Sequence, residues 1–232
     1  MNMHYFDLGR HDHDFLHAQW VSLTSQNAPN RAVIESLFDS IVEQYSASER
    51  AYHNLSHIQS LLALSESLLD KVQNRDALYF AIWFHDVIYD TKRSDNEEKS
   101  AEFAAEALAG LEVSEQTVTT TREMILATKY HRADDLSWDM KAFLDLDASI
   151  FGAPEDVYKE YSRAIRKEYS WVPDFLYRKG RMKVLNDFLG RERIYNTEEF
   201  RAKYETQARH NIAEEIRTLS DLPEASTQGS AR

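Results

Sequence analysis

The stretch that most constrains the fold is RDALYFAIWFHDVIYD, which covers residues 75–90. It is apolar on nearly every face, and such a helix is stable only when other elements surround it. We therefore expect a central, buried helix here. The run contains an ionisable pair, His85 and Asp86. Burying an unpaired carboxylate is costly, so Asp86 should be paired, protonated or bound to a metal ion. The alternative is that His85 bonds a neighbouring carbonyl and Asp86 points to solvent at the helix end.

The rest of the chain predicts amphipathic helices that can pack around this central one. In residues 31–46, for example, apolar side chains recur at helical spacing and fall on one face. The 232 residues include only six Gly and four Pro, which argues against a turn-rich all-β fold. The sequence therefore predicts an all-α fold. We expect one helical domain over residues 1–220 and a disordered tail over residues 221–232.

Charge and cysteine content argue against several classes of protein. The formal net charge is −12, which disfavours tight nonspecific binding to nucleic acid, because that affinity comes largely from Lys and Arg. The chain has no cysteine, so a metal ion would need ligands from His, Asp or Glu. The N-terminus has no apolar signal core, and no run is apolar enough to span a membrane. We expect a cytoplasmic protein without membrane contacts.

Histidines and aspartates outside the central helix are further candidate ligands. His53 and His57, in YHNLSHI, are four residues apart and lie on one side of a helix start. Asp145 and Asp147, in LDLDASIFG, interrupt an apolar segment and point to different faces, so at most one joins a shared site easily. The alternatives are polar residues at a helix entrance for the histidines, and exposed or capping positions for the aspartates. The pairs in RHDHDF, which include His13, lack an apolar helix around them.

The order of these motifs resembles the HD-domain superfamily of metal-dependent phosphohydrolases. Its signature is an isolated His, a His-Asp pair on a buried helix and a later Asp. The chain is similar, over about residues 15–200, to small bacterial HD proteins labelled predicted phosphohydrolases, through the segments YHNLSHI, WFHDVIYD, DNEEKSA, LDLDASIFG and IRKEYSWVPDFLYRKGRMKVLNDFL.

The resemblance implies an HD-domain helical bundle and a metal site. The four ligand positions it assigns are His57, His85, Asp86 and Asp147. We favour Asp147 over Asp145 because the family's last Asp is followed by a short helical continuation, here ASIFG. Two imidazoles and two carboxylates suit one divalent ion: Mn²⁺, Co²⁺, Ni²⁺, Fe²⁺, Zn²⁺ or Mg²⁺.

Other residues are candidates for catalysis and substrate binding. Asp90 follows Asp86 by one helical turn, so we expect it to act as general acid or base near the metal, unless it simply ends the helix. Glu97 is a rival, although first-turn glutamates usually interact with the helix dipole. Residues 163–183 carry seven basic and two acidic side chains, a local reversal of charge that is either a phosphate clamp or solvated surface. The candidate substrate-binding residues are His53, Glu97, His131, Arg166 and Arg181.

Together these features favour a metal-dependent phosphohydrolase that cleaves a small phosphate ester through metal-activated water. A nucleotide is the commonest substrate kind in the superfamily. One alternative is a two-iron HD oxygenase. Dinuclear branches use further histidines between the HD pair and the last Asp, where this chain has only His131, although His53 could add a ligand. That departure favours one metal. The other alternative is a degenerate HD domain that serves as a ligand-binding or regulatory module.

Overall fold

The computed structural model describes residues 10–25, 30–132 and 136–221. All regular secondary structure in these ranges is helical, which confirms the predicted all-α fold. The predicted tail lies outside the described residues except for Asp221, which ends the last helix. In chain order the helices are α1 (His13–Thr24), α2 (Arg31–Tyr45), α3 (Leu55–Ser65), η1 (Glu66–Leu68), α4 (Arg75–Phe84), α5 (Asn96–Gly110), α6 (Glu115–Ala127), α7 (Trp138–Asp147), η2 (Ala148–Gly152), α8 (Glu155–Glu168), α9 (Asp174–Leu189) and α10 (Glu198–Asp221).

Short polar side chains begin many of these helices. The carboxylate or amide oxygen of Asp12, Asn30 and Asn74 accepts a hydrogen bond from the backbone N–H three residues later. Asn54 caps α3 in the same way through the N–H of Ser56. These caps satisfy N–H groups that have no partner inside a helix. The sequence therefore marks where α3 and α4, two helices that carry site residues, begin.

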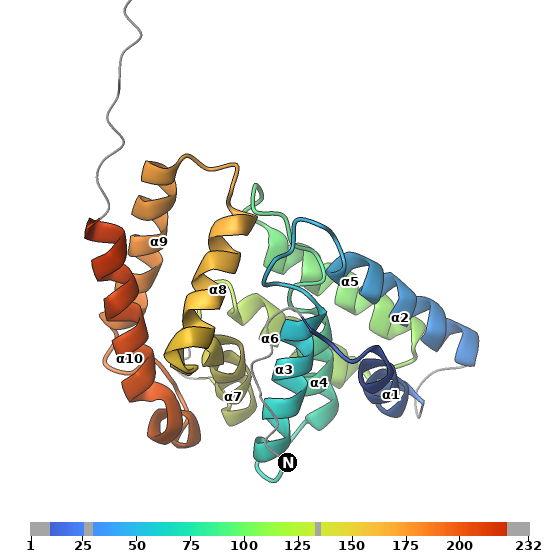
Figure 1. The fold of residues 1–232 in the computed structure, drawn as a ribbon. Helices are drawn as coiled ribbons and strands as arrows, with labels where there is room; N and C mark the ends of the chain where they lie inside the picture. The colour runs from blue at the N-terminus through green and yellow to red at the C-terminus, as the bar shows by residue number, and fades with distance from the viewer. Residues whose placement is uncertain (1–9, 26–29, 133–135, 222–232) are drawn as a thin grey trace, which may run out of the picture.

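Helix α4 lies in the middle of the molecule, as its apolar sequence predicts. It contacts α3, α5, α6 and α7. Its last five residues, Phe80–Phe84, are all fully buried. In Figure 1 the C-terminal helices α8, α9 and α10 lie on one side, α1, α2 and α5 on the other, and α3, α4, α6 and α7 between them. The candidate metal ligands described below come from this middle layer, and other residues of the site come from α5, α8 and α9.

The central helix ends earlier than its sequence suggests. We expected it to continue to Asp90, but α4 ends at Phe84 and residues 85–90 form turns and irregular chain. Arg50, which is distant in the sequence, donates hydrogen bonds to the carbonyl oxygens of Asp86 and Val87, at 2.6 and 2.9 Å. Because these carbonyls find partners outside the helix, the chain can leave the helical path without losing hydrogen bonds.

The C-terminal helix packs directly on η2, the short helix that follows Asp147. At the contact, a Cβ added to Gly152 would lie 2.5 Å from the Cβ of Tyr204, so only glycine permits this approach. The Asn211 side chain donates to the carbonyls of Phe151 and Ala153, both at 2.8 Å. The segment after Asp147 is thereby fixed against α10.

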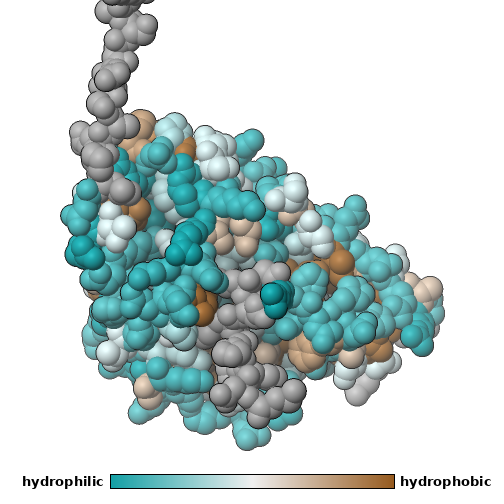
Figure 2. Space-filling view, in the orientation of Figure 1, coloured by the Kyte–Doolittle hydropathy of each residue, from teal (hydrophilic) through white to brown (hydrophobic). Residues whose placement is uncertain are grey.

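The surface agrees with the acidic, polar composition. The face shown in Figure 2 is largely hydrophilic, with small hydrophobic areas between the helices. Within the described ranges, no helix combines the length and apolar character needed to cross a membrane.

Candidate metal centre

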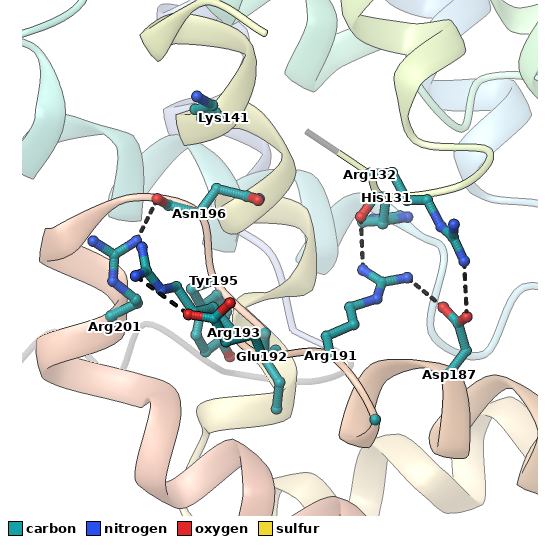
Figure 3. A pocket seen from close by; sticks show the side chains of 12 residues that line it. His131, Arg132, Lys141, Asp187, Arg191, Glu192, Arg193, Tyr195, Asn196 and Arg201 are labelled. Atoms are coloured by element: carbon teal, nitrogen blue, oxygen red, sulfur yellow. Dashed lines mark hydrogen bonds and ion pairs between the residues drawn. The ribbon is translucent and has the colours of Figure 1, made fainter. Parts of the chain in front are cut away.

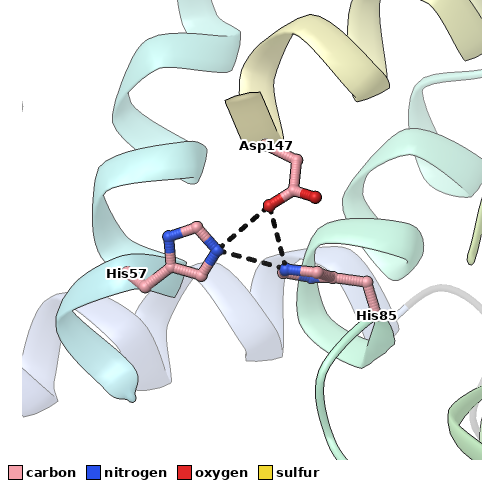
Figure 4. Close-up of side chains that lie close together, drawn as sticks. All are labelled: His57, His85 and Asp147. Atoms are coloured by element: carbon pink, nitrogen blue, oxygen red, sulfur yellow. Dashed lines mark hydrogen bonds and ion pairs between the residues drawn. The ribbon is translucent and has the colours of Figure 1, made fainter. Parts of the chain in front are cut away.

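Two buried histidines and a partly buried aspartate, from three helices, meet at one point (Figure 4). His57 is in the first turn of α3, His85 is the C-cap residue of α4, and Asp147 is the last residue of α7. The two Nε2 atoms are 3.1 Å apart. The Oδ1 atom of Asp147 lies 3.4 Å from Nε2 of His57 and 3.5 Å from Nε2 of His85. The structure thus brings together three of the four predicted ligands in a group that could hold a metal ion.

The hydrogen bond on the far side of the His85 ring fixes its orientation. Nδ1 lies 3.0 Å from the carbonyl oxygen of Ile82, which can only accept, so Nδ1 carries the hydrogen. A neutral His85 therefore points the lone pair of Nε2 at His57 and Asp147. A ligating histidine is commonly held in this way, with its other nitrogen on a backbone carbonyl. The expected alternative, a His85 that bonds a carbonyl, is thus compatible with a metal-binding role.

The electrostatics of the group favour a cation. Burial opposes a charge on His85, but Asp86 and Asp147 outweigh burial and raise the pKa of His85 well above its ordinary value. Burial also opposes ionisation of Asp147, yet hydrogen bonds from His131, His57 and His85 hold its pKa well below the usual range. Burial lowers the pKa of His57. Positive charge at this point is therefore stabilised by carboxylates, and a metal ion could take the place of the proton on His85.

The fourth predicted ligand, Asp86, borders this group. Its Oδ2 atom lies 3.1 Å from Nε2 of His85, and its side chain is 19% exposed. Burial opposes its ionisation, but His85 and His53 hold the pKa of Asp86 below its ordinary value. Asp86 is therefore an anionic wall of the cavity beside the three convergent atoms, and its direct bond to a metal stays a prediction.

Asp147, and not its neighbour Asp145, joins the two histidines. The Asp145 carboxylate is fully occupied elsewhere: its oxygens accept from the backbone N–H and side chain of both Asn196 and Thr197, at 2.7–2.8 Å. Asp145 therefore ties the chain that precedes α10 to α7. The choice between the two carboxylates made from the sequence agrees with this geometry.

A buried glutamate beside the site was not predicted. Glu168, the last residue of α8, accepts from the backbone N–H of Tyr52 and His53, from His53 Nδ1 at 2.7 Å, and from the hydroxyl of Tyr89. Burial opposes its ionisation, but His53 lowers the pKa of Glu168 to about 2. The sequence signal was its position, seven residues after Tyr161 on the buried face of an amphipathic helix. A carboxylate on such a face is a candidate for a functional pairing.

A cavity of about 1620 Å³ lies beside the candidate metal centre. Asp86 and Asp147 line it, and so do four predicted substrate-binding residues: His53, Glu97, His131 and Arg181. His131 also contacts one of the candidate metal ligands, because its Nε2 lies 2.8 Å from Oδ2 of Asp147. The structure therefore gathers side chains of α5, α6, α7, α8 and α9 around one volume, together with the segments that precede α3 and follow α4 and α6.

Two other predicted residues lie away from this cavity. Asp90 is exposed, and its carboxylate accepts from the backbone N–H of Lys92. Arg166 donates to the carbonyls of Tyr169 and Val172 and to Asp174. Neither lines the cavity among the described residues.

Arg181 lines the cavity but already has an anionic partner. It is buried and forms two hydrogen bonds with Glu215, at 2.9 and 3.0 Å. Its guanidinium can add positive potential to the cavity, and its donors are largely used within the protein.

A second, smaller cleft of about 730 Å³ adjoins the first and is rich in basic residues. Figure 3 shows that most of these are paired: Asp187 lies between Arg132 and Arg191, at 3.2 and 2.5 Å. Arg201 donates to the carbonyl of Asn196. His131, Arg132, Asp187 and Arg191 line both cavities. The cleft therefore extends the cavity towards the start of α10.

Comparisons with known proteins found no match to this chain. No protein-family model matches the chain, and neither the curated proteins nor the solved structures include a significant match.

Proposed function

We propose that this protein is a metal-dependent phosphohydrolase of the HD-domain type. The observation that carries the proposal is the convergence of His57, His85 and Asp147, whose ligand atoms lie within 4.8 Å of one another beside a large cavity that Asp147 lines. The order of motifs in the sequence, which resembles that superfamily, supports the same function.

The residues present fit one divalent ion. His57, His85, Asp147 and Asp86 would hold it, and the hydrogen bond from His85 to the Ile82 carbonyl keeps that ring in the ligating tautomer. Nitrogen and carboxylate ligands suit Mn²⁺, Co²⁺, Ni²⁺, Fe²⁺, Zn²⁺ or Mg²⁺. When bound, such an ion lowers the pKa of water and polarises a phosphoryl oxygen.

The chain's own residues can supply a proton and bind the anion. Burial opposes a charge on His53, but Glu168 and Asp86 raise the pKa of His53, so its ring can donate a proton to the leaving oxygen at neutral pH. Glu168 positions this ring through its bond to Nδ1. Lys129, Arg181 and Arg191 line the cavity, each beside a carboxylate partner, and would add positive potential next to a negatively charged substrate. Asp90, exposed and off the cavity, remains a sequence-based candidate for the same proton transfer.

One observation favours a second candidate, a dinuclear oxygenase. Asp147 faces His57 and His85 with Oδ1 and faces His131 with Oδ2, so its two oxygens could serve two ions. Further ligands for the second ion would come from the cavity wall. The two functions differ in metal stoichiometry and in the consumption of oxygen.

A metal analysis combined with a substrate screen tests the proposal. We expect one divalent ion per chain, and phosphate release from at least one member of a panel of phosphate monoesters and nucleotides. Asp86→Ala should abolish metal binding and turnover while circular dichroism retains the helical signal. Two irons per chain with oxygen uptake would support the oxygenase instead. A folded protein that binds no metal at all would leave only a ligand-binding module.

A further inference from the structure

The exposed apolar side chains of the described residues are not scattered. Six large hydrophobic residues are exposed, and all lie either at the end of α6 or between Trp171 and the middle of α9. All but Phe175 line the large cavity. We call these five the apolar rim: Leu126, Tyr130, Trp171, Leu176 and Val184. Exposed hydrophobic residues that gather in this way mark a binding site.

The ring of Trp171 is held in place although 52% of the residue is exposed. Its Nε1 donates to the hydroxyl of Thr91 at 2.7 Å, and the ammonium of Lys92 lies 5.8 Å from its ring centroid. Thr91 follows the His85-Asp86 turn and also lines the cavity. An aromatic surface that is already ordered costs little entropy to use in binding.

Helix α9 presents a matching stripe to the cavity. Leu176, Gly180 and Val184 are four residues apart, so they follow one side of the helix, and all three line the cavity. A Cβ added to Gly180 would find no atom within 4 Å. The glycine therefore leaves open space between two apolar side chains on the cavity wall.

The composition of the lining indicates what this space accommodates. Nine rings of Phe, Tyr and Trp line the cavity, but among the described lining residues there is no Asn, Gln or Ser. Side-chain amides are the groups that most often read the hydrogen-bonding edges of a base such as adenine. The volume of about 1620 Å³ also exceeds the roughly 300–1,000 Å³ of ordinary small-molecule sites. The lining also carries charged side chains and tyrosine hydroxyls, but its many rings and the apolar rim suit a large group with an extended apolar surface.

The cavity thus has two chemically different ends. Asp86 and Asp147 line it beside the histidines that could bind a cation, and Arg181 lines it too, whereas the exposed part of the lining carries the apolar rim together with charged side chains such as Glu123 and Lys183. We propose that the substrate is a phosphate ester whose leaving group is bulky and apolar, and that the apolar rim binds this leaving group. The inference rests on the proposed function for the phosphate end of the substrate.

A binding experiment that needs no turnover tests this. The Mn²⁺-loaded protein is titrated with 1-naphthyl phosphonate, methyl phosphonate and uridine monophosphate in a calorimeter. We expect 1-naphthyl phosphonate to bind at least about tenfold more tightly than either competitor, because a buried ring contributes both area and aromatic contacts. Equal affinities for the two phosphonates, or tighter binding of the nucleotide, would overturn the inference.

Variants locate the effect at the rim. Trp171→Ala should weaken 1-naphthyl phosphonate binding about tenfold and leave methyl phosphonate unchanged. Phe175→Ala is the matched control, because Phe175 lies four residues later at the start of α9 and is 59% exposed, but does not line the cavity. Gly180→Leu should exclude the naphthyl group by filling the open space, where an added Cβ meets no atom within 4 Å. Loss of binding in Phe175→Ala equal to that in Trp171→Ala would contradict a specific rim.

Two outcomes separate this inference from the proposed function. Tight, Trp171-dependent binding of 1-naphthyl phosphonate without hydrolysis of any phosphate ester supports binding of a bulky apolar group at the apolar rim. It contradicts the phosphohydrolase function. Equal kcat/KM for methyl and 1-naphthyl phosphate, with equal phosphonate affinities, contradicts the inference and leaves the function standing. If the rim instead binds a second copy of the chain, the protein will sediment as a dimer that Leu176→Asp dissociates, which also overturns the inference.

Discussion

Asp145 and Asp147 are two residues apart on α7, yet their carboxylates have opposite surroundings. Asp145 accepts from four donors of Asn196 and Thr197 and has no capacity left for a ligand. Asp147 faces three imidazoles, which can change between donor and acceptor with protonation. A buried carboxylate that is satisfied by fixed donors is structural, whereas one surrounded by histidines is suited to a cation. The kind of partner, more than burial, separates the two.

The largest expected effect tests the cation side of this comparison. Asp147→Asn keeps the shape of the side chain and removes its charge, so metal affinity should fall by more than about 100-fold, beyond the loss typical of residues that only orient ligands. Competition with a chromogenic chelator measures this affinity. Asp145→Asn is the control, and the folded fraction of that variant should retain its metal. A similar loss of metal in both variants would mean that the comparison is wrong.

Asp145 should contribute more than Asp147 to the free energy of unfolding of the metal-free protein. Asp145→Ala leaves two backbone N–H groups and two side-chain donors without their acceptor, so we expect a loss of about 3 kcal/mol in the free energy of unfolding. Urea unfolding of the metal-free protein measures it. Metal-free Asp147→Asn should lose less under the same conditions, and the reverse order would contradict the assigned roles.

Glu168 combines features of both aspartates, because fixed backbone donors and a histidine bind it. Its pKa in the folded protein is about 2, below its ordinary value of 4.5, so ionised Glu168 stabilises the fold above pH 4.5. This contribution, up to about 3 kcal/mol, is lost as the pH falls towards 2. Glu168→Gln should therefore be less stable than the wild type near pH 6, with a difference that shrinks on acidification. A difference independent of pH between 6 and 3 would rule out this ionisation.

The smallest expected effect concerns His131. It supports Asp147 through one hydrogen bond, so His131→Asn should weaken metal binding about tenfold. Asn is chosen because His131 has a φ of 46°, a conformation that Asn tolerates better than Ala. His13→Ala, in the N-terminal His-Asp pairs, should leave metal binding unchanged. A loss in His131→Asn as large as in Asp147→Asn would favour a direct ligand and the dinuclear alternative.

The sequence was sufficient for the fold class and for three convergent side chains that could hold a metal ion. Helical periodicity and scarce Gly and Pro specify the all-α fold, because both act locally. The same local reasoning predicted a central helix that continues to Asp90, whereas α4 ends at Phe84. Its end depends on Arg50, a residue 36 positions before Asp86 that binds the Asp86 carbonyl. Such a partner leaves no mark in the periodicity of the segment itself.

Long-range partners also explain what sequence reasoning could not assign among the charged residues. From the sequence, Arg181 is a candidate phosphate-binding residue. In the structure its guanidinium is paired with Glu215, which lies 34 residues later in the chain. From the sequence, Glu168 is one of two acidic residues in a basic segment. In the structure it accepts hydrogen bonds from the backbone N–H groups of Tyr52 and His53. Charge along the chain indicates which groups are present, and only the packing of α8 and α9 decides which of them are paired.

The close packing of α10 on η2 links the end of the chain to the metal centre. Gly152 permits the contact, Asn211 fixes the carbonyls of η2, and Asp147 immediately precedes this segment. None of the predicted ligands belongs to α10, yet any ion bound by Asp147 would favour the arrangement in which α10 is docked. Metal binding should therefore slow amide hydrogen exchange in the last helix, so that occupancy of the site can be read at the opposite end of the sequence.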